Sequence, residues 1–230
     1  MSKSRVPLTQ EPFRGTEFAE QYDRYAAFFM RPEYRLTAKN IGRYGITGGL
    51  VLDVGTGTGR LALELTRSPQ LSFKVIGLDI SFDMLQRGRV LAGKMERLNR
   101  TDFVQATGAS LPFPNNTFDV VTSYASLHHW QDPVRVFNEI WRVTRNSGLI
   151  LIRDNRRVVG IPIYDAARKV ISLFMPEARR QLWPKALMAS YTLPEIRQIL
   201  DQTDMRLAQV RADMAGFDLC ISLIKNQAGK

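Results

Sequence analysis

The chain has 230 residues, of which 44% are hydrophobic, and 32 lysines and arginines against 22 acids give a net charge of +10. This length and apolar content suffice for one full core, and we expect a single domain over residues 1–230. We find no run of about 18 apolar residues and no apolar leader core near the start, so we expect neither a membrane-spanning helix nor a secretory leader. One cysteine excludes an internal disulfide framework, so we expect a cytoplasmic protein. Two histidines and one cysteine cannot form a four-ligand zinc site without carboxylates, and we expect no metal.

A glycine loop follows the first apolar run. The run over residues 50–54 includes Asp53, and Gly55, Gly57 and Gly59 follow at intervals of two before helical spacing begins. The run predicts a buried strand of a parallel sheet, and the glycines let a ligand lie against bare backbone. A dinucleotide-binding fingerprint requires a small residue five positions after the first glycine, where this chain has Arg60.

A second apolar run, residues 73–79, ends in Asp79, twenty residues after Gly59. A carboxylate at the end of the second strand can accept hydrogen bonds from both ribose hydroxyls of a nucleoside. The alternative is that Asp79 begins the next helix, but Ser81 is the better N-cap.

A third region combines Leu-Pro-Phe-Pro at residues 111–114 with Phe-Asp-Val-Val at 118–121 and Leu-His-His at 127–129. Residues 118–121 predict the fourth strand. Together with the Asp-x-Gly-x-Gly-x-Gly loop and Asp79, these motifs resemble the class I S-adenosylmethionine (SAM) methyltransferases. They are most similar to the small-molecule branch with quinone-biosynthesis and sterol-type enzymes. The resemblance covers residues 18–155 well and the rest loosely.

The resemblance implies an α/β Rossmann-like fold with a seven-stranded, mostly parallel sheet and helices on both faces. It divides the chain into an N-terminal helical lid (1–45), a SAM-binding core (46–155), a substrate cap (156–190), and a closing helix with a β-hairpin (191–230). The aromatic stripe of residues 18–29 fits such a lid, or it simply packs on the sheet. In the closing part, Thr192 and Glu195 predict a capping box, and strands are expected near 206–213 and 217–224, with Cys220 as a buried structural thiol.

The cofactor implied is SAM, with S-adenosylhomocysteine as its product. Its implied binding residues are Tyr22, Asp53, Gly55, Gly57, Gly59, Asp79, Ile80, Met84, Thr107, Gly108, Ala109 and Ser123. Thr107 stands where the family usually has an Asp that bonds the adenine amino group, so we expect the Thr107 hydroxyl and the Gly108 backbone to replace it.

His128 and His129 are the only histidines, and they follow the fourth strand, where the acceptor approaches. Imidazole is the natural general base near neutral pH, so both are catalytic candidates, and we favour His128. Adjacent residues point in different directions, so at most one is expected to face the pocket. The alternative is that the pair supports the loop.

The cap segment, residues 156–190, has seven basic residues against two acids, with Val170, Ile171, Phe174, Met175, Trp183 and Leu187 interleaved. This pattern suggests an anionic or prenylated substrate, or contact with an anionic membrane. The alternative is a solvated basic face over an ordinary core.

We therefore expect methyl transfer from SAM to oxygen or carbon of a small molecule, with nitrogen less favoured. One alternative is RNA methylation, which the basic charge permits. Against it, the chain shows no appended RNA-binding module, and residues 123–126 are Ser-Tyr-Ala-Ser where nucleobase-amine enzymes have a proline corner. Nucleic acid is thus disfavoured as a partner. Another alternative is a non-catalytic SAM-binding protein. The sequence leaves the oligomeric state open.

Overall fold

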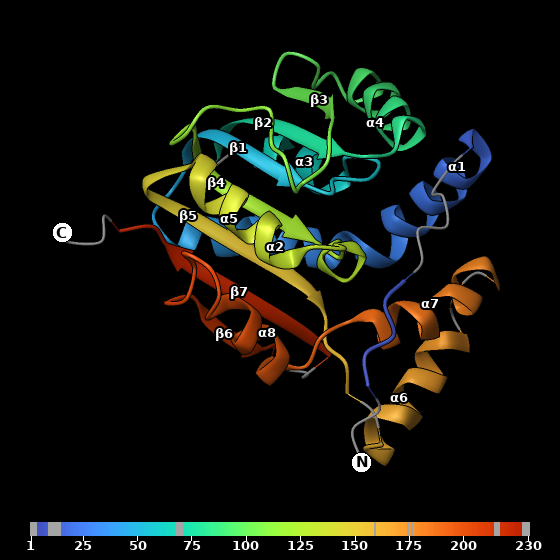
Figure 1. Ribbon diagram of the computed structural model, residues 1–230. Helices are drawn as coiled ribbons and strands as arrows, with labels where there is room; N and C mark the ends of the chain where they lie inside the picture. The colour runs from blue at the N-terminus through green and yellow to red at the C-terminus, as the bar shows by residue number, and fades with distance from the viewer. Residues whose placement is uncertain are drawn as a thin grey trace.

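The computed structural model describes residues 4–8, 15–67, 71–158, 160–173, 175, 177–213 and 217–226. In these residues, seven strands form one sheet in the order β3-β2-β1-β4-β5-β7-β6 (Figure 1). The strands are β1 Gly48–Val54, β2 Ser72–Asp79, β3 Thr101–Gln105, β4 Phe118–Tyr124, β5 Thr144–Asn155, β6 Gln209–Ala212 and β7 Asp218–Ile224. β7 pairs antiparallel with β5 and β6, and the remaining pairs are parallel. The predicted fold class is confirmed.

The helices of the described residues cover both faces of the sheet. They are α1 Thr16–Tyr25, α2 Arg31–Arg43, α3 Arg60–Arg67, α4 Phe82–Lys94, α5 Pro133–Val143, α6 Pro162–Leu173, α7 Glu177–Ala189 and α8 Leu193–Leu200, with a π-helical turn η1 at Ala26–Met30 and a 3₁₀ turn η2 at Leu127–His129. Figure 1 shows α5 and α8 in front of the sheet and α2 and α3 behind it. None of these helices is long and apolar enough to span a bilayer.

The hydrophobic core has two layers, one on each face of the central strands. On β5, Ile150 and Ile152 belong to the cluster under α5 and α8, whereas Leu149 and Leu151 belong to the cluster under α2 and α3. Successive side chains of a strand point to opposite faces, so a strand covered on both sides is apolar throughout. This explains the unbroken apolar run that the sequence shows there.

The direction of strand addition reverses between β1 and β4. From β1 the order runs to β2 and β3 on one side and to β4 and β5 on the other. The helices that follow β1 and β4 therefore cover opposite faces, which leaves a crevice at the carboxyl ends of these strands. That edge lies on the right in Figure 1, where α1 also lies.

Local signals at the helix ends are confirmed. The Ser81 hydroxyl accepts a hydrogen bond from the Met84 N–H (3.4 Å) and caps α4. Thr192 and Glu195 form the predicted capping box at the start of α8. Both motifs depend only on residues three apart, so the sequence contains the whole interaction.

The last part of the chain differs slightly from the prediction. β6 begins at Gln209 instead of residue 206, because the Arg206 and Ala208 N–H groups bond back to Thr203 and Met205 in turns. The sequence pattern could not separate these turns from the strand. β7 matches its expected range, and Cys220 is buried in it, which raises the pKa of the thiol.

The segment between β5 and α8 forms two helices, α6 and α7, which project from the body of the molecule (Figure 1). The Val6 N–H donates to the Met188 carbonyl (3.0 Å), so residues 4–8 run alongside α7. Met175 is buried, but Val170 and Ile171 are 56% and 40% exposed. Phe174, expected among the apolar positions, lies outside the described residues.

Candidate functional site

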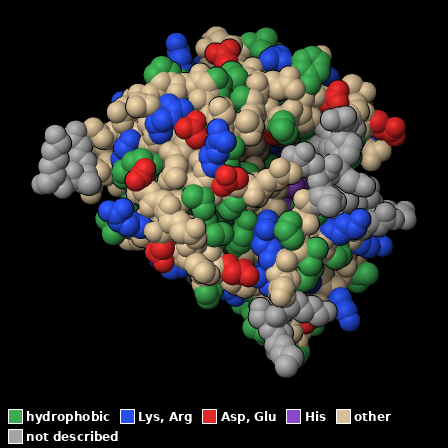
Figure 2. All heavy atoms as spheres, viewed as in Figure 1, with side chains coloured by type: hydrophobic (Ala, Val, Ile, Leu, Met, Phe, Trp, Pro, Cys, Tyr) green, Lys and Arg blue, Asp and Glu red, His purple; other side chains and the backbone are tan. Residues whose placement is uncertain are grey.

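A cavity of about 310 Å³ opens at the crevice. It is lined by eleven of the fourteen residues that the sequence predicts for the site: Tyr22, Gly55, Gly57, Asp79, Ile80, Met84, Thr107, Gly108, Ala109, His128 and His129. Asp53, Gly59 and Ser123 do not line it. Both histidines do, so the expectation that at most one of them would face the pocket is wrong. In Figure 2 a histidine side chain is visible within a hollow of this face.

The glycine loop forms part of the cavity wall. Gly55 and Gly57 have φ angles of +72° and +55°, which side chains rarely adopt. A Cβ on Gly55 would overlap Ser126 Oγ, whereas a Cβ on Gly57 would stand 3.6 Å from Tyr22 Cε1. Gly57 therefore leaves bare backbone in the cavity beneath the Tyr22 ring.

Gly59 has a different role from the other two glycines. Its φ is +73°, and a Cβ there would lie 2.6 Å from Phe103 Cε1. The missing side chain allows the start of α3 to pack closely against β3. Gly59 thus supports the loop from behind, although the sequence pattern groups it with the ligand-facing glycines.

Asp79 stands at the end of β2 and faces the cavity. Its Oδ2 accepts a hydrogen bond from the Gly57 N–H (2.8 Å), and its Oδ1 accepts one from the Ser81 N–H (2.9 Å). Burial raises the pKa of Asp79, and these backbone bonds oppose the shift. The carboxylate is therefore oriented by two fixed donors next to the bare backbone of the loop.

Asp53 lies below the loop and is 1% exposed. It accepts a hydrogen bond from the Thr56 hydroxyl (2.6 Å), and burial together with the charge of Asp79 raises its pKa to about 7. Asp53 therefore holds the loop through Thr56, and its side chain does not reach the cavity. Ser123 is also buried, in β4, and its hydroxyl has no hydrogen-bond partner within the described structure.

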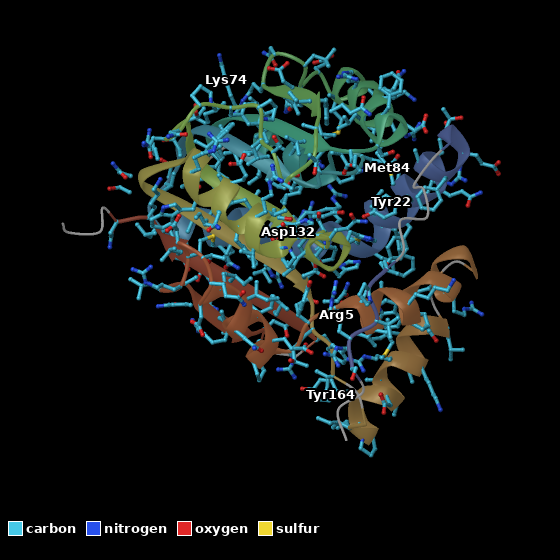
Figure 3. All side chains as sticks on the ribbon, in the orientation of Figure 1. Arg5, Tyr22, Lys74, Met84, Asp132 and Tyr164 are labelled. Atoms are coloured by element: carbon cyan, nitrogen blue, oxygen red, sulfur yellow. The ribbon has the colours of Figure 1, made fainter. Side chains whose placement is uncertain are left out.

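Helix α1 closes one side of the cavity with Tyr22. The next residue, Asp23, is 1% exposed and pairs with Arg60 (2.5 Å) at the start of α3 and with Arg87 (2.8 Å) on α4. Figure 3 shows Tyr22 on α1 across from Met84 on α4. The buried carboxylate between two guanidinium groups holds α1 over the elements that form the loop.

His128 lines the opposite wall and contacts Asp154, a buried carboxylate that does not line the cavity. His128 Nδ1 lies 2.6 Å from Asp154 Oδ1, and the His128 backbone N–H donates to Asp154 Oδ2 (3.1 Å). Both residues are 2% exposed. When Nδ1–H donates its hydrogen bond to the Asp154 carboxylate, the lone pair of the neutral ring lies on Nε2. The arrangement can therefore accept a proton from a bound molecule.

Asp154 was not identified from the sequence. It comes from the carboxyl end of β5, 26 residues after His128. The available signal was an acid at the end of an apolar strand, the same signal that indicated Asp79. Further lining residues after β4, such as Ala125, Trp130, Asp132 and Val136, were also missed individually, although their region was expected to face the ligand.

Comparisons with known proteins agree with this geometry. A family model described as a methyltransferase domain matches residues 52–152. The demethylmenaquinone methyltransferase of Lactococcus lactis is 33% identical over 169 residues, which cover 73% of this chain and 66% of that protein. The ubiquinone/menaquinone biosynthesis C-methyltransferase UbiE of Cronobacter sakazakii is 29% identical over 171 residues, covering 74% and 67%.

The chain belongs to the class I SAM-dependent methyltransferases. It spans about two thirds of the length of the two curated relatives. Among solved structures, a Methanococcus maripaludis protein assigned to the SAM-dependent methyltransferases matches with a TM-score of 0.74 at 20% identity, over 97% of this chain and 99% of that chain. The plantazolicin methyltransferase BpumL, in complex with SAH, matches with a TM-score of 0.73 at 17% identity, over 94% and 92%. At these identities the structures show the shared fold.

The family cofactor is compatible with the residues of the cavity. The ribose of SAM needs a hydrogen-bond acceptor such as a carboxylate, and its methionine part needs backbone that no side chain covers. Asp79 and Gly57 provide these two features in the cavity. Thr107, the departure from the family pattern, also lines the cavity, and its hydroxyl accepts the Ala109 N–H (3.3 Å). No cluster of metal-binding side chains occurs within the described ranges.

Proposed function

We propose that this protein transfers the methyl group of SAM to a carbon or oxygen of a small, phenol-like acceptor such as a reduced quinone. The observation that carries the proposal is the buried His128–Asp154 pair, whose histidine lines the same cavity as the glycine loop and Asp79. The names of the curated relatives, which include quinone C-methyltransferases, support the acceptor class.

In this proposal the chain binds the cofactor with the residues described above. Asp79 accepts hydrogen bonds from the ribose hydroxyls, the Gly55–Gly57 backbone meets the methionine part, and Tyr22 covers it. The Thr107 hydroxyl and the Gly108 backbone contact the adenine. Bound SAM supplies a methyl group already activated on a sulfonium, so the protein must chiefly align the acceptor and exclude water.

His128 would act on the acceptor. Its Nε2 removes the proton of a phenolic hydroxyl, and the resulting oxyanion makes the oxygen or the adjacent ring carbon nucleophilic. Asp154 is a positioning residue, because it holds the ring through Nδ1 and stabilises the imidazolium that forms. For carbon methylation, rearomatisation releases the ring proton after transfer.

The remaining parts of the chain have proposed roles as well. Residues 1–45 act as the lid and residues 156–190 as the cap over the acceptor, and α7 contacts the η2 turn that carries His128. The cytoplasm is the proposed compartment, because its reducing conditions suit the buried, unpaired Cys220.

Transfer of labelled methyl from SAM to menadiol, a simple phenol, an alkylamine and bulk RNA tests the proposal. We expect label in menadiol or the phenol. His128→Asn should lower kcat by about 10²–10⁴-fold while the Kd for SAM stays unchanged. His129→Asn should cost less, since His129 is more exposed to water.

Other results would contradict the proposal in distinct ways. Label in RNA alone would support an RNA methyltransferase. SAM binding without transfer to any acceptor would support a non-catalytic protein. Equal losses in the His128 and His129 variants would refute the assignment of the base.

A further inference from the structure

Helix α6 presents an apolar face to solvent. Ile163, Val170 and Leu173 are 74%, 56% and 69% exposed, and Ala166 between them is also exposed. Their spacing of three, four and three residues places all four on one side of the helix. A helix of a globular protein normally turns such a stripe toward the core.

The side of α6 that faces the protein carries Tyr164 and the buried Arg168 instead. Arg168 is 8% exposed, donates to the Val158 carbonyl and pairs with Asp165 (3.5 Å). The Tyr164 ring packs edge-on against Phe217 at 5.1 Å, and Figure 3 shows Tyr164 at the base of α6. Among the residues that the structure describes, no packing contact accounts for the outward apolar stripe of α6.

Exposed basic side chains occur on α6 and on the neighbouring helix α7. Lys169 on α6 and Arg180 and Lys185 on α7 are exposed, and residues 156–190 have seven basic residues against two acids. Figure 2 shows hydrophobic and basic side chains next to one another over α6 and α7, at the lower right. Exposed aliphatic side chains bordered by lysine and arginine are the composition of helices that lie in the surface of an anionic bilayer.

We propose that the outward face of α6 docks on an anionic lipid bilayer, with Ile163, Val170 and Leu173 inserted among the acyl chains and Lys169 at the headgroups. This contact is separate from the chemistry of the cavity and does not depend on the identity of the acceptor.

A second copy of the chain fits this face less well. A helix of twelve residues is about 18 Å long, too short to bury the roughly 800 Å² per partner of a typical stable interface. A symmetric pairing of the two stripes would also bring the basic residues of the two copies together. A bilayer instead offers complementary charge and requires no matching shape.

Sedimentation with vesicles tests the proposal on the full-length protein. We expect binding to vesicles of equal parts phosphatidylcholine and phosphatidylglycerol, and much weaker binding to phosphatidylcholine alone. The triple variant Ile163→Ser, Val170→Ser, Leu173→Ser should bind the anionic vesicles at least about tenfold less well. Leu98→Ser with Leu207→Ser is the matched control, because these leucines are 57% and 81% exposed elsewhere and should leave binding unchanged.

The double variant Lys169→Glu with Lys185→Glu tests the role of charge. It should weaken binding to the anionic vesicles, and the binding that remains should depend less on salt concentration. Circular dichroism confirms that each variant is folded. Absence of vesicle binding by the wild-type protein, or equal binding by the triple variant, would overturn the proposal. A dimer in sedimentation velocity that the triple variant abolishes would assign the face to a second copy instead.

Discussion

The carboxylate of Asp79 offers the most direct test of how the cavity binds its cofactor. Asp79→Asn retains the shape of the side chain and one acceptor oxygen but replaces the other oxygen with an NH₂ group that cannot accept. In the structure the two oxygens accept hydrogen bonds from the Gly57 and Ser81 N–H groups, which hold the carboxylate in the orientation that we propose binds the ribose hydroxyls. Losing one charge-assisted hydrogen bond should cost about 1–3 kcal/mol of binding, or roughly 5–150-fold in Kd.

Calorimetric titration with SAM and with S-adenosylhomocysteine measures this loss. Both ligands contain the ribose, so both should weaken by the same factor. A larger loss for SAM would instead indicate attraction between Asp79 and the positive sulfonium. Asp102→Asn is the control, because this exposed carboxylate on β3 does not line the cavity.

Unchanged affinity for both ligands in a folded Asp79→Asn protein would refute ribose binding by Asp79. The ribose would then be bound by other groups, and the acid at the end of β2 would serve only the loop. Loss of affinity in the Asp102 variant as well would show that overall charge, and not a local bond, governs binding.

Three further changes test packing and charge. Gly59→Ala places a Cβ 2.6 Å from Phe103 and should lower the unfolding free energy, measured in urea, by about 2–4 kcal/mol. Gly160→Ala is the control, because Gly160 has a similar positive φ but lies in open space, and it should cost only about 1 kcal/mol. Equal losses in the two variants would refute the clash. Because burial raises the pKa of Asp53 from 3.8 to about 7, the folded state binds its proton more tightly, and the unfolding free energy should fall by up to about 4 kcal/mol as pH rises from about 4 to about 7. Asp53→Asn should lack this part of the slope, and an identical pH profile would contradict the assignment. Asp23→Asn removes the carboxylate between two guanidinium groups and should cost about 3 kcal/mol and speed hydrogen exchange in α1; unchanged exchange would show that other contacts hold the lid.

Much of the cavity wall around the glycine loop could be predicted from the sequence alone. The glycine loop, Asp79 and the Ser81 cap are contiguous or follow directly from strand ends, so their pattern contains the geometry. The parallel order of the strands then brings these ends to one edge, as the topology confirms.

The tertiary structure decided which of the predicted residues reach the cavity. Gly59 and Asp53 belong to the same motif as Gly57, yet one packs on Phe103 and the other lies below the loop. A motif specifies residue types, whereas the direction of each side chain depends on the elements packed around it.

The tertiary structure alone also revealed the Asp154 partner of His128 and the outward apolar side of α6. The first pair joins the end of β5 to the turn after β4, and only the alignment of neighbouring strands brings these atoms to 2.6 Å. For α6, helical periodicity predicts a two-sided helix but cannot tell which side faces the protein. That choice depends on what lies beside the helix, and here the buried Arg168 and the Tyr164–Phe217 contact turn the apolar side outward.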